Sequence, residues 1–323
     1  MCISLISTAH PDYPFILLSN RDEFLNRPTA RADWWDSPNQ HVLGGRDLQR
    51  QIQGTWLAIT RDGRIANLTN FRDEGVEVSR DKSRGGLVNS YVITPPHADP
   101  GDESFIRSLV DDFGIHDVGG FTLLFGRLRK PNDGNTTGLG MISNRTESSA
   151  DTKRICTKLG QTNGLSNSHY GDLTWPKVVH GEQLLKQAIG ASVSRQDDMD
   201  KFVESLFDIL SVDTLPRPEQ NEPWQSYTRQ LRNSILIPPF GGEDIENKSA
   251  DKIAAANGTS TPDHSNVTVG EGAYGTQRQT VILVSTEGGV TFIERSLHEG
   301  KRVEPDISDR DRRFEFKIDG WED

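Results

Sequence analysis

The residue with the clearest capacity for chemistry in this sequence is Cys2, which directly follows Met1. Its side chain is small, so removal of Met1 would leave Cys2 as the amino-terminal residue. A terminal cysteine combines a nucleophile and a base, because its α-amino group titrates at about pH 8 and is able to take the thiol proton. The alternative is that position 2 only begins a buried strand and Met1 stays in place.

A run of four polar residues, Asn20-Arg21-Asp22-Glu23, is the second candidate. It follows an apolar run over residues 15–19, and an earlier apolar run covers residues 3–7. If the two runs pair as a hairpin, the end of the second lies close to the start of the first, and Arg21 stands beside Cys2. A guanidinium there would favour the thiolate and hold a substrate carboxylate or carbonyl. Taken alone, such a segment is more commonly a solvated charged turn.

Two asparagines, Asn70 and Asn167, are candidates for an oxyanion site. Asn70 ends the segment Asn67-Leu68-Thr69-Asn70, and Asn167 ends Gly164-Leu165-Ser166-Asn167. A carboxamide donates two hydrogen bonds, which suits a developing oxyanion. The commoner role of such an asparagine is to stabilise its own turn.

The elements that must position these residues are strands at both ends of the chain and helices in the middle. Strands are expected at 3–7, 15–19, 55–60, 65–69, 121–126 and 140–143, and again at 280–285, 289–294 and 314–318. An Asp62-Gly63 turn joins the third and fourth of these. Helical periodicity covers 106–113 and 199–210, and Pro176 suits the first turn of a helix to about residue 189. This order predicts an α+β fold with a largely antiparallel sheet.

Composition excludes several classes of function. The 323 residues carry a formal net charge of −11, which argues against nucleic-acid binding because phosphate contacts need clustered basic residues. No apolar run is long enough for a transmembrane helix, and no secretory signal is expected at the start. The two cysteines, Cys2 and Cys156, cannot form a disulfide framework, and the scattered histidines do not support a metal site.

One stretch, residues 242–272, is predicted to be a disordered insertion. It holds many polar residues and no aromatic residue, so it cannot bury enough surface to offset its ordering entropy.

Several separate motifs, in order along the chain, resemble the NRDE family, which includes the transport and Golgi organisation protein two homologues. The motifs are Met1-Cys2-Ile3, Asn20-Arg21-Asp22-Glu23, Gly44-Gly45-Arg46-Asp47, Gly54-Thr55-Trp56-Leu57-Ala58, Leu68-Thr69-Asn70-Phe71-Arg72, Ser83-Arg84-Gly85, Gly164-Leu165-Ser166-Asn167, Trp175-Pro176-Lys177-Val178, and Tyr274-Gly275-Thr276 with Thr280-Val281. The match runs from residue 1 to about residue 295, and we expect the whole chain, residues 1–323, to be one domain.

The resemblance implies a four-layer αββα sandwich similar to the amino-terminal-nucleophile (Ntn) hydrolases, among which the choloylglycine and penicillin V amidases use a terminal cysteine. Carried over by position, Cys2 is the nucleophile and Arg21 its partner. Asn70 and Asn167 form the oxyanion site, and Arg278 closes it. In those amidases an acidic residue follows the arginine by three positions, and this chain has Phe24 there. Asp22 or Glu23 must therefore orient the amine. We assign this role to Asp22.

The resemblance also implies a cellular role. Members of the family are linked to Golgi organisation, protein secretion, haem mobilisation and lipid or acyl-CoA handling. We therefore expect a pocket around Cys2 that binds a small molecule (haem, an acyl chain or an amide), with no required cofactor and with haem as a transported ligand. The expected location is the cytoplasm, with peripheral association with membranes of the Golgi or with mitochondria.

Two main hypotheses follow. The first is a binding or trafficking protein that kept the fold and lost the chemistry, and the altered acidic spacing favours it. The alternative is an active amidohydrolase that cleaves a non-peptide C–N bond of a small linear amide. A third, weaker hypothesis is a membrane-trafficking scaffold that acts through residues 242–272.

Overall fold

The computed structural model describes residues 1–71, 84–95, 101–216, 224–240, 272–299, 302–303 and 310–322. Its first two strands, β1 (Ile3–Ser7) and β2 (Phe15–Phe24), pair antiparallel as the expected hairpin. Side chains alternate between the two faces of a strand, yet every residue of β1 is buried. Both faces of this hairpin are therefore covered by other parts of the chain.

The remaining strands are β3 (Thr29–Trp34), β4 (Val42–Asp47), β5 (Leu57–Thr60), β6 (Arg64–Asn70), β7 (Phe121–Arg127), β8 (Leu139–Ser143), β9 (Lys153–Ile155), β10 (Thr162–Ser166), β11 (Tyr274–Val284), β12 (Gly289–Ser296), β13 (His298–Glu299), β14 (Arg302–Val303) and β15 (Asp311–Lys317). They form a six-stranded sheet of order β10-β1-β2-β11-β12-β15 and a seven-stranded sheet of order β3-β4-β5-β6-β7-β8-β9, while β13 and β14 pair with each other. Neighbouring strands in both large sheets run antiparallel.

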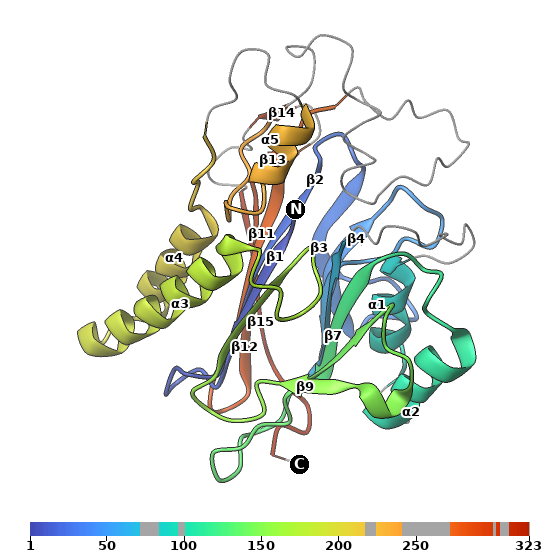
Figure 1. Ribbon diagram of the computed structural model, residues 1–323. Helices are drawn as coiled ribbons and strands as arrows, with labels where there is room; N and C mark the ends of the chain where they lie inside the picture. Colours follow the sequence, from blue (N-terminus) through green and yellow to red (C-terminus); the bar gives the residue numbers. More distant parts are fainter. Residues whose placement is uncertain are drawn as a thin grey trace.

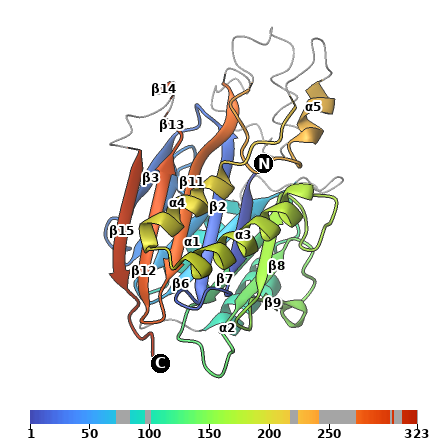
Figure 2. The ribbon, with the colours of Figure 1, turned by 90° about the vertical axis from the view of Figure 1, so that its left-hand side faces the viewer.

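The helices are α1 (Arg84–Val92), α2 (Asp102–Arg107), α3 (Pro176–Arg195), α4 (Met199–Leu210) and α5 (Trp224–Gln230), with a π-helical segment at Ser108–Phe113 and a 3₁₀ turn at Ser149–Asp151. Figure 1 shows the two large sheets face to face, with α3 and α4 outside one and α1 and α2 outside the other. Figure 2, turned by 90°, shows α3 and α4 crossing the outer face of the six-stranded sheet.

Three apolar clusters separate the four layers. Ile6, Leu17 and Ile282 belong to the cluster between the sheets, together with residues of the seven-stranded sheet such as Leu57 and Ile65. Residues at the alternating positions of the same strands lie on the opposite face of the sheet and pack on α3 and α4. They include Ile3, Leu5, Ile16, Leu18 and Val281. A third cluster joins α1 and α2 to the seven-stranded sheet. The predicted α+β fold with αββα layers and largely antiparallel sheets is confirmed.

The sequence-based element boundaries need correction at the polar segment 20–23. The predicted second strand ends at residue 19, but β2 continues through Glu23 to Phe24. Asn20, Arg21, Asp22 and Glu23 are all buried, so the alternative of a solvated turn is wrong. The strand continues because each of these polar side chains finds a partner in another part of the fold.

No predicted strand corresponds to β3, β4, β9, β10, β13 or β14, and β4 shows why. Its centre carries Gly44 and Gly45, residues that normally weaken a strand. A Cβ atom on Gly44 would lie 2.6 Å from the carbonyl oxygen of Leu57, and one on Gly45 would lie 2.7 Å from the Trp56 ring. These glycines allow neighbouring groups to approach closely, a requirement that the sequence pattern does not reveal.

The helices agree with their predicted positions, with differences in detail. The side chain of Asp198 accepts a hydrogen bond of 2.9 Å from the Lys201 amide, so it caps α4. Helix α3 extends to Arg195, beyond the predicted end. The run predicted as one helix at 106–113 is divided between α2 and the π-helical segment. The stretch predicted as an insertion, 242–272, lies outside the described residues except for Gly272, and the single-domain organisation stays a prediction.

Candidate active site at the start of β1

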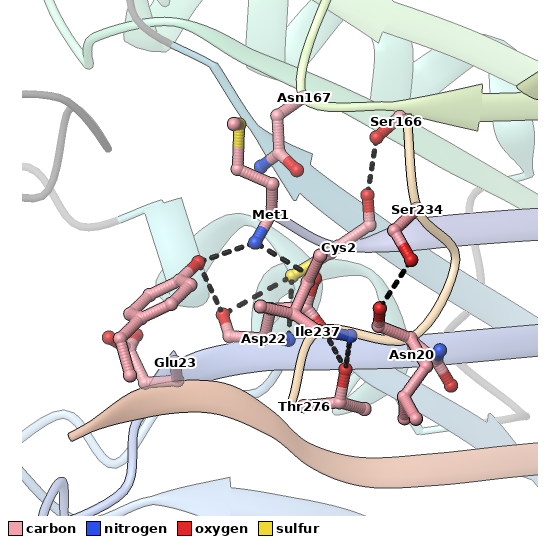
Figure 3. A network of polar contacts seen from close by, with 12 residues as sticks. Met1, Cys2, Asn20, Asp22, Glu23, Ser166, Asn167, Ser234, Ile237 and Thr276 are labelled. Carbon is pink, nitrogen blue, oxygen red and sulfur yellow. Dashed lines mark hydrogen bonds and ion pairs between the residues drawn. The ribbon is translucent and has the colours of Figure 1, made fainter. Parts of the chain in front are cut away.

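The candidate site forms where β1 begins, between the end of β10 and the polar half of β2 (Figure 3). The hairpin register pairs Ile3 with Asn20. Because the strands are antiparallel, this register places Cys2 opposite Arg21 and Met1 opposite Asp22. The sequence-based expectation that Arg21 stands beside Cys2 therefore agrees with the strand register.

The Cys2 thiol is held against the backbone of Asp22. Its Sγ atom lies 3.4 Å from the Asp22 amide nitrogen and 3.7 Å from the Asp22 carbonyl oxygen. The Cys2 carbonyl oxygen accepts a hydrogen bond of 2.5 Å from the Ser166 hydroxyl of β10. Burial raises the pKa of the Cys2 thiol above its ordinary value of 9.0, so the thiol is neutral while Met1 occupies the site.

The carboxylate of Asp22 holds the α-amino group at the start of the chain. Its Oδ2 atom lies 2.8 Å from the Met1 nitrogen, and the side chain is fully buried. The Met1 amine also donates a hydrogen bond of 2.5 Å to the Tyr274 hydroxyl. The second carboxylate oxygen, Oδ1, accepts from the Thr276 hydroxyl at 2.7 Å. Burial lowers the pKa of the Met1 amine below 8.0, and the Asp22 charge acts in the opposite direction.

The adjacent carboxylate, Glu23, serves a different group. Its Oε2 atom lies 3.7 Å from Arg21 Nη2 and 3.6 Å from Arg27 Nε. The Arg21 guanidinium also stacks on the Trp56 ring, 4.4 Å from the centroid, and donates a hydrogen bond to Gln277 Oε1. Because successive side chains of β2 point to opposite faces of the sheet, the Asp22 side chain contacts the amine and the Glu23 side chain contacts the arginines. Of the two acids that the sequence left open, Asp22 is the one in contact with the amine.

Asn70 and Asn167, which are far apart in the sequence, lie together. The side-chain nitrogen of Asn167 donates a hydrogen bond to the main-chain carbonyl of Asn70. The Oδ1 atoms of both residues are buried, and neither has a hydrogen-bond partner within the described residues. In this structure, one donor of the expected oxyanion pair is therefore bonded to the protein itself.

The late arginine, Arg278, is paired with Arg21 in the sheet, but its side chain contacts other groups. Strand β11 pairs Thr276 with Asp22 but Arg278 with Arg21, so Gln277 forms a bulge between them. Gln277 supplies the oxygen that contacts Arg21. Arg278 instead donates a hydrogen bond of 2.7 Å to the His298 carbonyl, and its Nε atom lies 3.9 Å from Glu294. The role of Arg278 in closing the site stays a prediction.

Sequence reasoning missed Lys177 as a site residue. Lys177 lies in the first turn of α3, is fully buried, and donates a hydrogen bond from Nζ to the Met1 carbonyl oxygen. Burial lowers the pKa of its ammonium, and the nearby Asp22 charge raises it. The only signal in the sequence was its place in Trp175-Pro176-Lys177-Val178. Tyr274 and Thr276 were likewise noted as part of a motif, without a role.

The described residues contain no cluster of three or more His, Cys, Asp or Glu side chains suited to hold a metal ion. Among the helices in this part of the chain, none has the length and apolar character needed to span a membrane.

Comparison with known proteins identifies the family. The family described as Transport and Golgi organisation 2 matches residues 1–299, which is most of the chain. The chain belongs to the Transport and Golgi organisation 2 family.

Relatives of this family member come from yeast and mammals. It is 28% identical to the uncharacterized protein YGR127W of Saccharomyces cerevisiae, over 98% of this chain and 100% of the yeast protein. It is 29% identical to the human Transport and Golgi organization protein 2 homolog, over 95% of this chain and 93% of the human protein. It is 30% identical to the homolog from Bos taurus, over 88% of this chain and 87% of the bovine protein.

Solved structures similar to this Transport and Golgi organisation 2 member are more distant. Penicillin V acylase from Agrobacterium tumefaciens has a TM-score of 0.37 and 12% identity, covering 91% of this chain and 83% of the acylase. The C2A mutant of conjugated bile acid hydrolase from Clostridium perfringens has a TM-score of 0.38 and 9% identity, covering 99% and 98%. At these scores and identities, the likenesses assign no activity to the chain.

Proposed function

We propose that this member of the Transport and Golgi organisation 2 family is an amidohydrolase whose nucleophile is Cys2 after Met1 has been removed. The observation that carries the proposal is the contact group at the start of β1. There Asp22 contacts the Cys2 thiol through its backbone and holds the α-amino end of the chain through its carboxylate. A thiol, an amine and a carboxylate that fixes the amine are the groups that a terminal-cysteine nucleophile needs. The contacts support the amidohydrolase alternative among the sequence-based hypotheses.

The reaction proceeds in two balanced stages. The Cys2 α-amine takes the thiol proton, and the thiolate adds to the carbonyl carbon of the amide. The C–N bond then breaks, the leaving amine takes the proton from the α-ammonium, and a thioester to Cys2 remains. Water adds to this thioester with the α-amine as base, which releases the carboxylic acid and restores the thiol.

The neighbouring residues have positioning and electrostatic roles in this proposal. Burial raises the pKa of Cys2, and the Arg21 charge acts against it by favouring the thiolate. Trp56, Gln277 and Glu23 hold Arg21 in place. Asn167 directly follows β10 and Asn70 ends β6, and their amides are candidates to bind the oxyanion.

The proposal is tested on protein whose first residue has been established by intact mass. Chain that begins at Cys2 should hydrolyse members of a panel of small acyl amides, whereas chain that begins at Met1 should not. Cys2→Ala should lose the activity, and Cys2→Ser should lose most of it because a hydroxyl is a weaker nucleophile at neutral pH. Inactivity of a folded Cys2-start chain toward the whole panel would argue against the enzyme.

A second candidate function is binding of haem or an acyl chain, which would serve Golgi organisation, protein secretion or lipid handling from the cytoplasm. It is favoured by an apolar cluster beside Met1 that contains Tyr227, Leu231, Ile237 and Tyr274. Titration of the purified wild-type protein and Cys2→Ala with haem provides the test. Binding through the thiol predicts a spectral change in the wild type that is altered in the variant. If neither protein shows a spectral change, haem binding is excluded. A separate titration with a fluorescent fatty acid tests the acyl version.

A further inference from the structure

Met1 is bound in the site as a ligand would be, through three of its groups. Its α-ammonium lies 2.8 Å from Asp22 Oδ2 and donates to the Tyr274 hydroxyl. Its carbonyl oxygen accepts from Lys177 Nζ. Its side chain packs against the apolar cluster that contains Ile237 and Tyr274. A cation, a carbonyl and an apolar chain, each with its own partner, are the recognition elements of an α-aminoacyl group.

Lys177 makes the strongest case that this space accepts a ligand. Its side chain is fully buried, and among the described residues its Nζ atom has one hydrogen-bond acceptor, the carbonyl oxygen of Met1. A buried ammonium without an acceptor is costly, because desolvation is not compensated. When Met1 leaves, Lys177 loses this acceptor and faces the space that Met1 filled. A ligand that brings a carbonyl or carboxylate oxygen restores the lost bond.

The apolar side of the same space is built from aromatic and aliphatic side chains. Tyr274 contributes both its hydroxyl, which binds the amine, and its ring, which lies 5.4 Å from the Phe24 ring and 5.7 Å from the Phe240 ring. The Met1 side chain is 14% exposed, so most of it is enclosed. An unbranched apolar side chain of similar length therefore suits the space.

We propose that the space filled by Met1 is a subsite for an L-α-aminoacyl group with an unbranched apolar side chain. Tyr274 and the Asp22 carboxylate, which in the proposed enzyme also holds the Cys2 amine, bind its ammonium, and Lys177 binds its carbonyl oxygen. This inference rests on the proposed function, because a ligand can enter the space only when Met1 has been removed and Cys2 is the first residue. Amides of such amino acids are then the substrate class presented to the Cys2 thiol, and the free amino acid is the product that remains in the subsite.

L-Norleucine is the probe, because it has the length of methionine and carries no sulfur. An amino-terminal fusion cut by a protease yields wild-type chain that begins at Met1 or at Cys2, and intact mass verifies each. Calorimetric titration should show saturable binding of L-norleucine to the Cys2-start chain and none to the Met1-start chain. Hexanoate lacks the ammonium and pentylamine lacks the carboxylate, so each should bind at least about tenfold more weakly than L-norleucine. This comparison needs no substitution.

Variants then test the role of Lys177 in the Cys2-start chain. Lys177→Met removes the charge at similar length, and Lys186→Met is the matched control on an exposed position of the same helix. Lys177→Met should weaken L-norleucine binding by about tenfold or more, while Lys186→Met should leave it unchanged. Lys177→Arg retains a donor and should recover part of the affinity. Circular dichroism and melting curves identify any variant that fails to fold.

The outcomes separate this subsite from the proposed enzyme. Equal L-norleucine binding by the two wild-type chains, equal binding by Lys177→Met and Lys186→Met, or no binding to a folded Cys2-start chain would overturn the subsite. Hydrolysis is measured separately on hexanoyl amides, which lack the α-amine. If the chain hydrolyses those amides but does not bind L-norleucine, the proposed enzyme activity is supported and the subsite is rejected. Binding without hydrolysis of any amide supports the subsite and rejects the enzyme.

Discussion

The α-amino group of Met1 lies 2.8 Å from Oδ2 of Asp22, and the Cys2 sulfur lies 3.4 Å from the amide nitrogen of the same aspartate. One residue of β2 therefore contacts the amine through its side chain and the thiol through its backbone. The adjacent Glu23 points to the arginines. Substitutions at 22 and 23 should for this reason have different effects, although both replace a buried acid.

Asp22→Asn should destabilise the protein and abolish any Cys2-dependent hydrolysis. The amide cannot balance the buried α-ammonium, so we expect a loss of about 1–3 kcal/mol in the free energy of unfolding. Urea unfolding of the Met1-start chain measures the stability, and amide hydrolysis by the Cys2-start chain measures the activity. Glu23→Gln is the matched control and should retain hydrolysis above the level of Asp22→Asn. Equal activity in the two variants would contradict the assignment of the amine to Asp22.

The two thiols should react slowly in the native Met1-start chain. Burial raises the pKa of Cys2 above 9.0 and that of Cys156 to about 12, so both are protonated at neutral pH. Since the thiolate is the reactive species, alkylation of Cys2 by iodoacetamide should accelerate only as the pH rises above 9.0, and alkylation of Cys156 should stay slow well above that pH. Peptide mapping by mass spectrometry resolves the two sites. Rapid Cys2 alkylation at pH about 7 would show that the thiol is not held in its neutral form.

Gln277 should contribute to stability through its acceptor oxygen. Gln277→Leu removes the acceptor for the buried Arg21 guanidinium and should lower the free energy of unfolding by about 1–3 kcal/mol. Gln277→Glu keeps an acceptor and adds an opposite charge, so it should be less destabilising than the leucine variant. Chemical denaturation of both variants provides the comparison. Equal stability of the leucine and glutamate variants would contradict this role of Gln277.

Glu294 should make stability depend on pH in the acid range. Burial raises its pKa above 4.5, while the Arg278 charge opposes the shift. The native state then holds a proton that the unfolded state releases, so its stabilising contribution is complete below pH 4.5 and is lost as the pH rises through the raised pKa. Glu294→Gln keeps an oxygen for the Ala32 amide and should remove this contribution to the pH dependence. Unfolding free energies over a pH series test this, with exposed Glu287→Gln as a control that should follow the wild type.

The sequence alone determined the class of fold and most of the chemistry-bearing residues. Apolar runs of period two and the helical repeat at 199–210 depend only on local alternation, so the α+β class and the position of α4 could be inferred from them. The position of Cys2 beside a removable methionine was equally visible. The segment 20–23 was harder, because polar residues in a buried strand depend on partners that lie far away in the chain.

Which group each of these residues contacts depends on the packing of distant parts of the chain. The register of β1 on β2 separates Asp22 from Glu23, and the bulge at Gln277 brings the Gln277 side-chain oxygen to Arg21, while the Arg278 side chain contacts His298 and Glu294. Lys177 reaches the Met1 carbonyl only because α3 packs against β1 and β10. Pairing across 176 residues is set by the packing of a helix on a sheet, and no local pattern in the sequence encodes it.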